Sequence, residues 1–211
     1  MIAYSISQEI ATIELIPDEK FNILNIPTLI ELRETFKKIA DSQAKVIRVK
    51  GEGGSFAVGA DIKKMIKYSG LTAKKFSILG NSLFKLMDSI PQVIIGEIDG
   101  FCMGGGVDFA ASCDFRLATK RSKFAHPGAK LGIITGFGGT QRLPRLMKPA
   151  HLQKLFLFGD MVDAEFMKEA NFILETFESV DEMNNFADNF AKKIARKNKL
   201  FLGEYKGFVG K

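Results

Sequence analysis

The sequence lacks an apolar segment long enough to cross a membrane. A spanning helix needs about 20 consecutive apolar residues, and Glu97 and Asp99 interrupt the most hydrophobic part of this chain. The start, MIAYSISQEI, has neither a basic leading region nor an apolar core followed by small residues, which a secretory signal requires. We therefore expect no membrane segment, no secretory signal and a cytoplasmic location.

Cysteine is scarce, because the 211 residues include only Cys102 and Cys113. They lie too far apart for a CxxC metal or redox motif and are too few for a disulfide framework. We expect both thiols to be reduced and buried. The remaining composition, 46% hydrophobic and 26% charged residues, is typical of one ordinary folded domain.

Basic residues outnumber acidic residues by 30 to 24, which gives a formal charge of +6. This excess favours an anionic ligand or partner. The most basic run, residues 192–199, alternates with apolar positions at helical spacing, which indicates a solvated helix face. We therefore expect no nucleic-acid partner.

The hydrophobic pattern predicts an α/β fold. Alternating apolar residues predict a hairpin over residues 2–16, and apolar residues three or four positions apart predict a helix from Asn25 to about Ser42. Further strands are expected at 45–50, 93–98 and 115–119, and further helices at 76–90, 107–113 and beyond 136. The order strand, glycine turn, helix, strand is thus repeated.

Two glycine-rich segments do not fit the nucleotide motifs that they suggest. Residues 54–59 have the spacing of a P-loop, but Ala60 and Asp61 follow where Lys and Ser or Thr are required. In residues 136–141, Gln141 occupies the third glycine place of a dinucleotide fingerprint. A nucleoside triphosphatase is therefore excluded, and the match to the dinucleotide-binding fingerprint is weak.

A third glycine segment, residues 98–115, carries more specific chemistry. Gly104, Gly105 and Gly106 precede a predicted helix, whose first N–H groups could stabilise a developing oxyanion. Asp108 lies about one turn along the same face, so one helix start could present an oxyanion donor and a proton acceptor. Alternatively, the glycines permit tight packing and Asp108 complements the helix dipole. The residues alone leave both readings open.

Three segments together resemble the enoyl-CoA hydratase/isomerase family, also called the crotonase superfamily: GSFAVGADIKKM (54–65), IDGFCMGGGVDFAASCDFRLAT (98–119) and FAHPGAKLGIITGFGGTQRLPRLM (124–147). FNILN (21–25) and LFGDMVDAEFMKEA (157–170) extend the resemblance over most of the chain. It implies a crotonase-like spiral of ββα repeats over residues 1–147, followed by a shortened helical C-terminal region over 148–211. Members of the family usually assemble as trimers or hexamers.

The resemblance also implies a site for an acyl-CoA thioester. In the family, the thioester carbonyl lies between two backbone N–H groups, which match those of Ala60 and Gly105, and this oxyanion hole stabilises an enolate. The CoA-binding residues match Ala60, Asp61, Ile62, Lys63 and Gly105. The implied role is that of a lyase or isomerase of fatty acid metabolism. No metal or redox cofactor is implied, because the coenzyme A thioester is itself the substrate.

One position departs from the family pattern. Family hydratases use two glutamates, which match Asp108 and Gly128 here, and glycine has no side chain to transfer a proton. We therefore expect Asp108 to be the single acid/base carboxylate. Isomerisation by one carboxylate, a water or anion in the space at Gly128, decarboxylation or thioester hydrolysis remain open, as does a non-catalytic acyl-CoA-binding subunit.

The motif region contains one histidine, His126, two residues before Gly128. An imidazole can supply acid/base chemistry near neutral pH. The matching family position often holds glutamine and is not usually catalytic. We therefore favour a structural or hydrogen-bonding role for His126.

Overall fold

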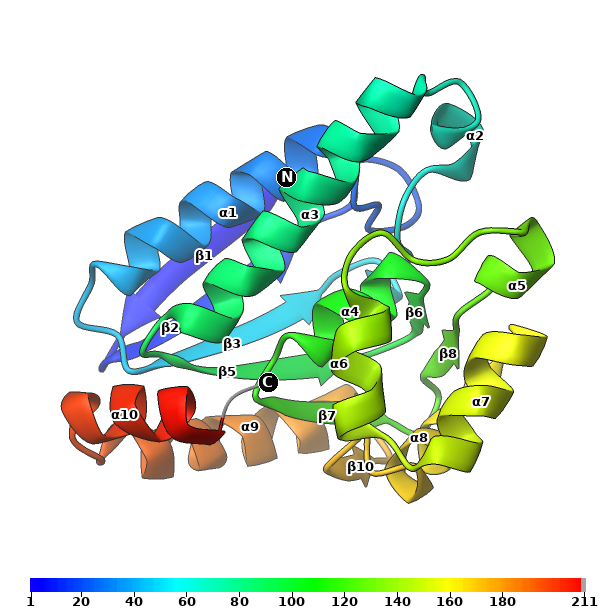
Figure 1. The fold of residues 1–211 in the computed structure, drawn as a ribbon. Coiled ribbons are helices and arrows are strands. Elements are labelled where there is room, and N and C mark those ends of the chain that lie inside the picture. Colours follow the sequence, from blue (N-terminus) through cyan, green and yellow to red (C-terminus); the bar gives the residue numbers. More distant parts are fainter. Residues whose placement is uncertain (210–211) are drawn as a thin grey trace.

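The computed structural model describes residues 1–209, in which ten strands form two sheets (Figure 1). The strands are β1 (Ile2–Ser7), β2 (Ile10–Leu15), β3 (Val46–Gly51), β4 (Ser55–Ala57), β5 (Val93–Ile98), β6 (Phe101–Met103), β7 (Phe115–Thr119), β8 (Lys123–Ala125), β9 (Val162–Asp163) and β10 (Glu175–Phe177). The helices are α1 (Ile26–Ala40), α2 (Ile62–Met65), α3 (Gly70–Ser89), α4 (Gly105–Ala111), α5 (Gly128–Leu131), α6 (Gly139–Leu146), α7 (Pro149–Phe158), α8 (Ala164–Glu169), α9 (Val180–Ala195) and α10 (Lys199–Val209).

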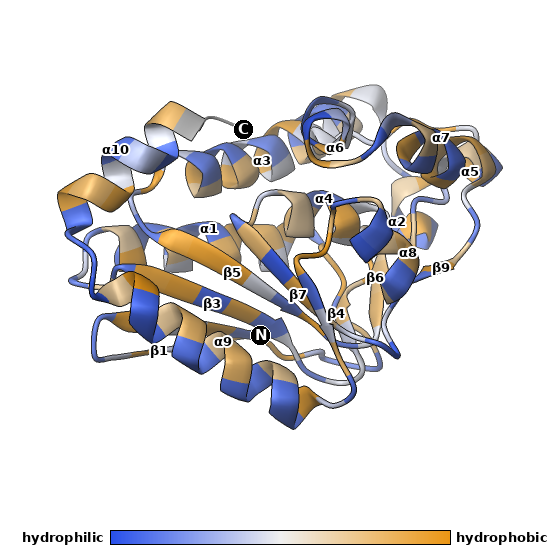
Figure 2. Ribbon diagram, turned by 90° about the horizontal axis from the view of Figure 1, so that it is seen from below, coloured by the Kyte–Doolittle hydropathy of each residue, from blue (hydrophilic) through white to orange (hydrophobic). Residues whose placement is uncertain are grey.

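The larger sheet has the strand order β1-β2-β3-β5-β7-β10. Strands β1 and β2 form an antiparallel hairpin, and every other neighbouring pair is parallel. Helices α1 and α3 cover one face and α9 covers the other (Figures 1 and 2). Because both faces are covered, the central strand β5 is buried along its whole length, as a parallel strand between helical layers should be.

The smaller sheet has the order β4-β6-β8-β9, and its first three strands are parallel. Each of these short strands directly follows a strand of the larger sheet: β4 follows β3, β6 follows β5, and β8 follows β7. The chain therefore alternates between the sheets and builds a spiral. Since β4, β6 and β8 run in the same direction, the turns that leave them lie at one edge of the smaller sheet.

Local sequence signals account for the longer helices. Helix α1 begins after Asn25, whose side chain accepts a hydrogen bond from the Thr28 amide at 3.0 Å; an asparagine in this position satisfies an amide that the helix leaves unpaired. Its apolar stripe is fully buried against the sheet. In α9, buried alanines pack with residues of β3, β5 and β7, whereas Lys192 and Lys193 near its end are exposed (Figure 2).

The expected hairpin, the helix after Asn25 and the strands near residues 45–50, 93–98 and 115–119 are confirmed. Helix α3 begins earlier than the pattern predicts, at Gly70, because the Ser69 side chain caps it by accepting from the Thr72 amide at 3.2 Å. The smaller sheet was not predicted. The glycine turn expected between the strand at 93–98 and the helix at 107–113 contains β6. Among residues 1–209, no helix is long and apolar enough to span a membrane.

Candidate active site

Three turns converge at the edge of the smaller sheet. The turn at Gly59 and Ala60 follows β4, the turn at Gly104 and Gly105 follows β6, and His126 follows β8. The Gly104 amide donates to the carbonyl of Ala125 at 2.8 Å, which joins the second turn to the third. The small sheet thus brings together residues that lie about 65 positions apart in the sequence.

The first turn is anchored by the segment FNILN. The carbonyl of Gly59 accepts from the Leu24 amide at 2.8 Å, and the Val58 amide donates to the Asn22 carbonyl at 2.9 Å. The buried Asn22 side chain donates in turn to the carbonyl of Ser55 at 2.7 Å. The segment therefore fixes the backbone that positions Ala60.

Two backbone N–H groups at this edge lack acceptors. Within residues 1–209, neither the Ala60 amide nor the Gly105 amide donates a hydrogen bond. Each follows a glycine with positive φ, +78° at Gly59 and +52° at Gly104, a conformation that favours glycine. A Cβ on Gly59 would lie 2.8 Å from the Gly105 nitrogen. The two turns are therefore in close contact, and both amides line the same cavity.

This cavity has a volume of about 310 Å³. Most of its lining is apolar and includes the buried Phe76 and Phe137 and the exposed Ile133 and Ile134. The lining side chains that carry a hydroxyl or a ring nitrogen are Tyr68, Ser77, His126 and Thr135. An apolar cavity with a few polar groups is the usual form of a small-molecule site.

Asp108, the expected acid/base residue, is fully buried on α4 and does not line the cavity. One carboxylate oxygen lies 3.2 Å from Nε2 of His126, and the other accepts a hydrogen bond from the Thr135 hydroxyl. A Cβ on Gly139 would lie 1.9 Å from the carboxylate. Asp108 therefore lies against the first residue of α6, where the helix N-terminus stabilises negative charge.

His126 separates Asp108 from the cavity. Its side chain is buried, with the residue 3% exposed, and its ring packs on the Phe156 ring with 4.5 Å between centroids. Within the described residues, Nδ1 is buried and has no hydrogen-bond partner. The expected hydrogen-bonding role is thus confirmed at Nε2, whereas the second ring nitrogen is left unpaired.

Gly128 does not leave the open space that the sequence suggested. A Cβ on Gly128 would lie 2.5 Å from the carbonyl oxygen of Ile133, a distance too short for any side chain. The Ile133 amide also donates to the Gly128 carbonyl at 3.0 Å, which closes the loop after α5. Glycine is required here because the backbone folds back on itself.

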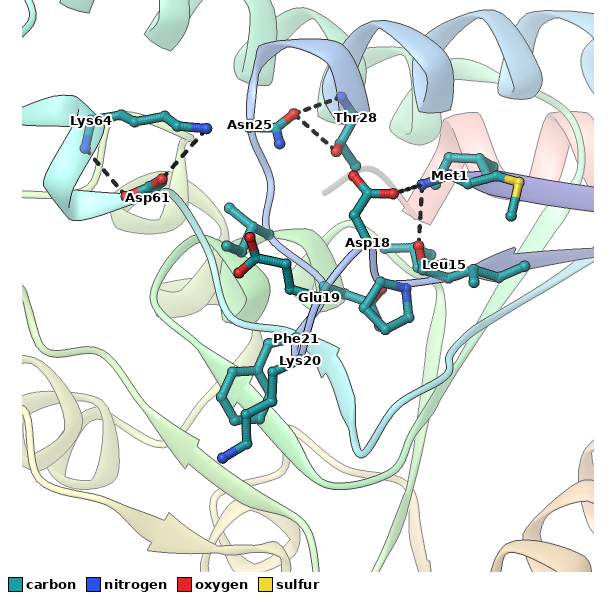
Figure 3. Close-up of a pocket in the computed structure, with 15 residues that line it drawn as sticks. Met1, Leu15, Asp18, Glu19, Lys20, Phe21, Asn25, Thr28, Asp61 and Lys64 are labelled. Atoms are coloured by element: carbon teal, nitrogen blue, oxygen red, sulfur yellow. Dashed lines mark hydrogen bonds and ion pairs between the residues drawn. The ribbon is translucent and has the colours of Figure 1, made fainter.

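The residues expected to bind CoA divide between two hollows. Ala60 and Ile62 line the apolar cavity, whereas Asp61 lines a second hollow of about 310 Å³ (Figure 3). There Asp61 faces Lys64, with 3.7 Å between the charged atoms. The Lys63 side chain is exposed and lines neither hollow. The segment after β4 is therefore a wall shared by the two hollows.

The second hollow is polar and of mixed charge. Asp18 points to the amino group of Met1, and Lys20 extends away from the other charges, beside the Phe21 ring (Figure 3). The Met1 and Lys64 cations are thus each paired with a carboxylate, whereas Lys20 contacts an aromatic ring.

Both cysteines are buried and neither forms a disulfide, as expected. Burial raises the pKa of the Cys102 thiol well above its ordinary value, and the nearby Cys113 thiol and Asp108 carboxylate raise it further. A thiol in such surroundings is a poor nucleophile. Within residues 1–209, no group of three His, Cys, Asp or Glu side chains is placed to hold a metal ion.

Thr135 is a site residue that was not predicted from the sequence. It orients the carboxylate through its hydroxyl, and that hydroxyl oxygen accepts from the Phe137 amide at 3.2 Å. Thr135 directly follows the apolar run GII, and its isolated hydroxyl was the one available signal. Its link with Asp108, 27 residues earlier, depends on the tertiary fold.

Residues 5–208 match the model of the Enoyl-CoA hydratase/isomerase family, so this chain belongs to that family. A crotonyl-CoA hydratase of Syntrophomonas wolfei is 36% identical over 160 residues, which cover 75% of this chain and 62% of that protein. A short-chain-enoyl-CoA hydratase of Clostridium acetobutylicum is 33% identical over 191 residues, or 90% of this chain and 71% of that protein.

The fold agrees with solved structures of the family. The crystal structure of an enoyl-CoA hydratase from Bacillus anthracis superposes with a TM-score of 0.92 at 26% identity and covers 99% of this chain and 81% of that one. The expected crotonase-like spiral with C-terminal helices is thereby confirmed.

Proposed function

We propose that this protein is an enzyme of the enoyl-CoA hydratase/isomerase type, which acts on an acyl-CoA thioester through a stabilised enolate. The observation that carries this proposal is the pair of unpaired amides, Ala60 and Gly105, from adjacent turns of one apolar cavity. Both would donate to the thioester carbonyl oxygen. When that oxygen gains negative charge, a donor of this kind is worth about 10²–10³ in kcat.

Hydration is the reaction that we assign. Two relatives that match 75% and 90% of this chain are named as hydratases of crotonyl-CoA and short-chain enoyl-CoA. The cavity of about 310 Å³ suits a short acyl chain. CoA would extend along the segment Ala60–Lys63, and Asp108 supplies the charge that drives proton transfer. No resident cofactor is needed.

Trimers or hexamers in the cytoplasm complete the proposal. Large apolar side chains remain exposed at the end of α7, where Leu157 is 70% and Phe158 is 60% exposed. Burial of such side chains between subunits would be favourable. Light scattering should report three or six times the chain mass of 23.3 kDa.

The test is hydration of crotonyl-CoA by the purified protein in deuterated water, with the product followed by mass spectrometry. We expect 3-hydroxybutyryl-CoA with one deuterium on the α carbon. Asp108→Asn should lower kcat by about 10²–10⁴ while CoA binding, measured by calorimetry, persists. CoA binding by the wild-type protein without turnover of any enoyl-CoA would contradict the proposal and indicate a binding subunit.

A further inference from the structure

The carboxylate of Asp108 has no direct route to the cavity. It is fully buried, and among the described residues that line the cavity there is no aspartate or glutamate. Two lining side chains contact it, His126 and Thr135. A threonine hydroxyl does not ionise near neutral pH and cannot store a proton, whereas an imidazole can.

The pairing of His126 favours one protonation pattern. A carboxylate accepts hydrogen bonds, so the 3.2 Å contact with Asp108 favours the tautomer that has its hydrogen on Nε2 and a lone pair on Nδ1. Among the described residues, Asp108 is the charged group in contact with the ring, and Phe156 packs on the ring from α7. A buried carboxylate in this arrangement orients an imidazole and stabilises its cation.

The unpaired Nδ1 lies on the side of Gly128. It is 3.9 Å from the position that a Cβ on Gly128 would take, and Gly128 itself lines the cavity. A buried nitrogen without a partner is costly to maintain. A ligand that donates a hydrogen bond to Nδ1 would remove that cost.

We propose that His126 is the catalytic acid/base of this site and that Asp108 is its positioning residue. This inference rests on the proposed function. As water attacks the β carbon, Nδ1 takes one of its protons and the C=C electron pair moves into the thioester to form the enolate. The enolate then collapses, and the α carbon takes the proton from Nδ1. The enoyl-CoA has gained one water, and His126 is neutral again.

One imidazole thereby does the work that otherwise needs two carboxylates. It accepts a proton in the first step and returns that proton in the second, so no acid is needed at position 128. The backbone carbonyl of Ile133 fills the direction in which a side chain at 128 would project. The loss of a group at 128 and the presence of an imidazole at 126 are two parts of one arrangement.

The chain contains a matched control. His151 is the only other histidine; its Nδ1 is also buried and unpaired within the described residues, and its Nε2 lies 3.7 Å from a Glu169 carboxylate oxygen. His151 does not line the cavity. Comparison of His126→Gln with His151→Gln therefore isolates the effect of position. Glutamine at 126 can still donate to Asp108 but cannot carry a proton.

We expect His126→Gln to lower kcat for crotonyl-CoA hydration by about 10²–10⁴, with KM and the unfolding midpoint nearly unchanged. His151→Gln should keep wild-type activity. Full activity of His126→Gln alongside an inactive Asp108→Asn would overturn this inference but leave the proposed function standing.

A second measurement reads the wild-type protein and does not require His126→Gln to fold. With two histidines in the chain, nitrogen-15 NMR of the wild-type imidazoles gives four ring signals, which His151→Gln assigns. We expect hydrogen on Nε2 of His126, and a shift of the Nδ1 signal when butyryl-CoA binds. Hydrogen on Nδ1, or no shift with bound butyryl-CoA, would contradict the inference.

Discussion

Two buried carboxylates of this protein differ in how completely their hydrogen-bonding partners are satisfied. Beneath α9, both carboxylate oxygens of Glu97 accept from the Arg48 guanidinium, at 2.6 and 2.8 Å. At the edge of the smaller sheet, Asp108 is equally satisfied, but its partner His126 keeps an unpaired nitrogen. We call the Arg48–Glu97 pair closed and the Asp108–His126 pair open, because Nδ1 of His126 is buried without a partner within the described residues. Complete pairing is typical of a structural element. An unpaired nitrogen is a candidate ligand contact where its residue lines a cavity, as His126 does and His151 does not.

The closed pair has further partners on the helix that covers it. Arg48 also lies 3.8 Å from Asp188 and donates to the Asn184 carbonyl at 3.4 Å, both on α9. Desolvation by itself would lower the pKa of Arg48, but the hydrogen bond and charge of Glu97 hold that pKa above its ordinary value. The closed pair therefore joins strands β3 and β5 to the helix that covers them.

The largest effect should be a loss of stability when one partner of the closed pair is removed. Glu97→Leu leaves a buried guanidinium without its main partner, and we expect the free energy of unfolding to fall by about 3–5 kcal/mol. Urea unfolding measures this loss. Activity at a temperature where the variant is folded should stay at the wild-type level, because the pair lies outside the cavity.

The double variant Arg48→Met with Glu97→Leu is the control for that prediction. Removal of both charges with retention of volume should restore most of the lost stability.

A pair at the surface is a second control. Lys120 and Glu178 have side chains that are 48% and 70% exposed, and Lys120→Ala should leave the urea midpoint unchanged. Equal losses for Lys120→Ala and Glu97→Leu would show that burial does not distinguish the pairs.

The second effect should be a fall in kcat when the Asp108 carboxylate of the open pair is displaced. An added methyl group at Gly139 would lie 1.9 Å from the Asp108 carboxylate, so Gly139→Ala must displace that carboxylate from His126. We expect kcat to fall by about 10²-fold, since a misplacement of about 1 Å can have this effect. Steady-state kinetics with crotonyl-CoA measures it.

Gly70→Ala is the matched control for Gly139→Ala. Gly70 is likewise the first residue of a helix, and a Cβ there would meet no atom within 4 Å. This variant should retain wild-type kinetics. If Gly139→Ala were also fully active, the position of Asp108 would not matter for catalysis.

The smallest expected effect is a pH dependence of the free energy of unfolding, caused by the buried thiol of Cys102 near Asp108. Burial, with Cys113 and Asp108 nearby, raises the pKa of Cys102 in the folded state. The unfolded chain therefore loses this proton first, so the stabilising contribution is complete below about pH 8.5 and declines as the pH rises further. We expect a decline of at most about 1.4 kcal/mol per pH unit, measured by urea unfolding between neutral and alkaline pH.

Cys102→Ala should reduce this alkaline decline, because it removes the group that titrates in the unfolded state. Asp108→Asn should weaken it, since the charge that opposes thiolate formation is lost. An identical pH dependence in wild type and Cys102→Ala would assign the decline to other groups.

The longer strands and helices could be predicted from the sequence, whereas the shortest strands could not. The hairpin, α1 and the strands β3, β5 and β7 each have a hydrophobic period long enough to recognise, and they lie where expected. Strands β4, β6 and β8 have three residues each, too few for any period. They exist because parallel pairing at the ends of the longer strands stabilises them, which is a tertiary effect.

The backbone features of the site could be predicted from the sequence, whereas the contacts between its side chains could not. The glycines before Ala60 and Gly105 indicated turns that expose N–H groups, and the structure leaves both amides unpaired. The contact of Asp108 with His126, 18 residues apart, has no local signal. Its catalytic meaning is still a prediction.

The sequence by itself determined the family, the α/β spiral and the two glycine turns, because hydrophobic period and glycine placement act over a few residues. Tertiary structure alone decided that Asp108 is sealed from the cavity, that the Ile133 carbonyl occupies the space beside Gly128, and that His126 stands between the carboxylate and the cavity. These outcomes depend on packing between turns of β4, β6 and β8, which only the assembled small sheet brings within hydrogen-bonding distance.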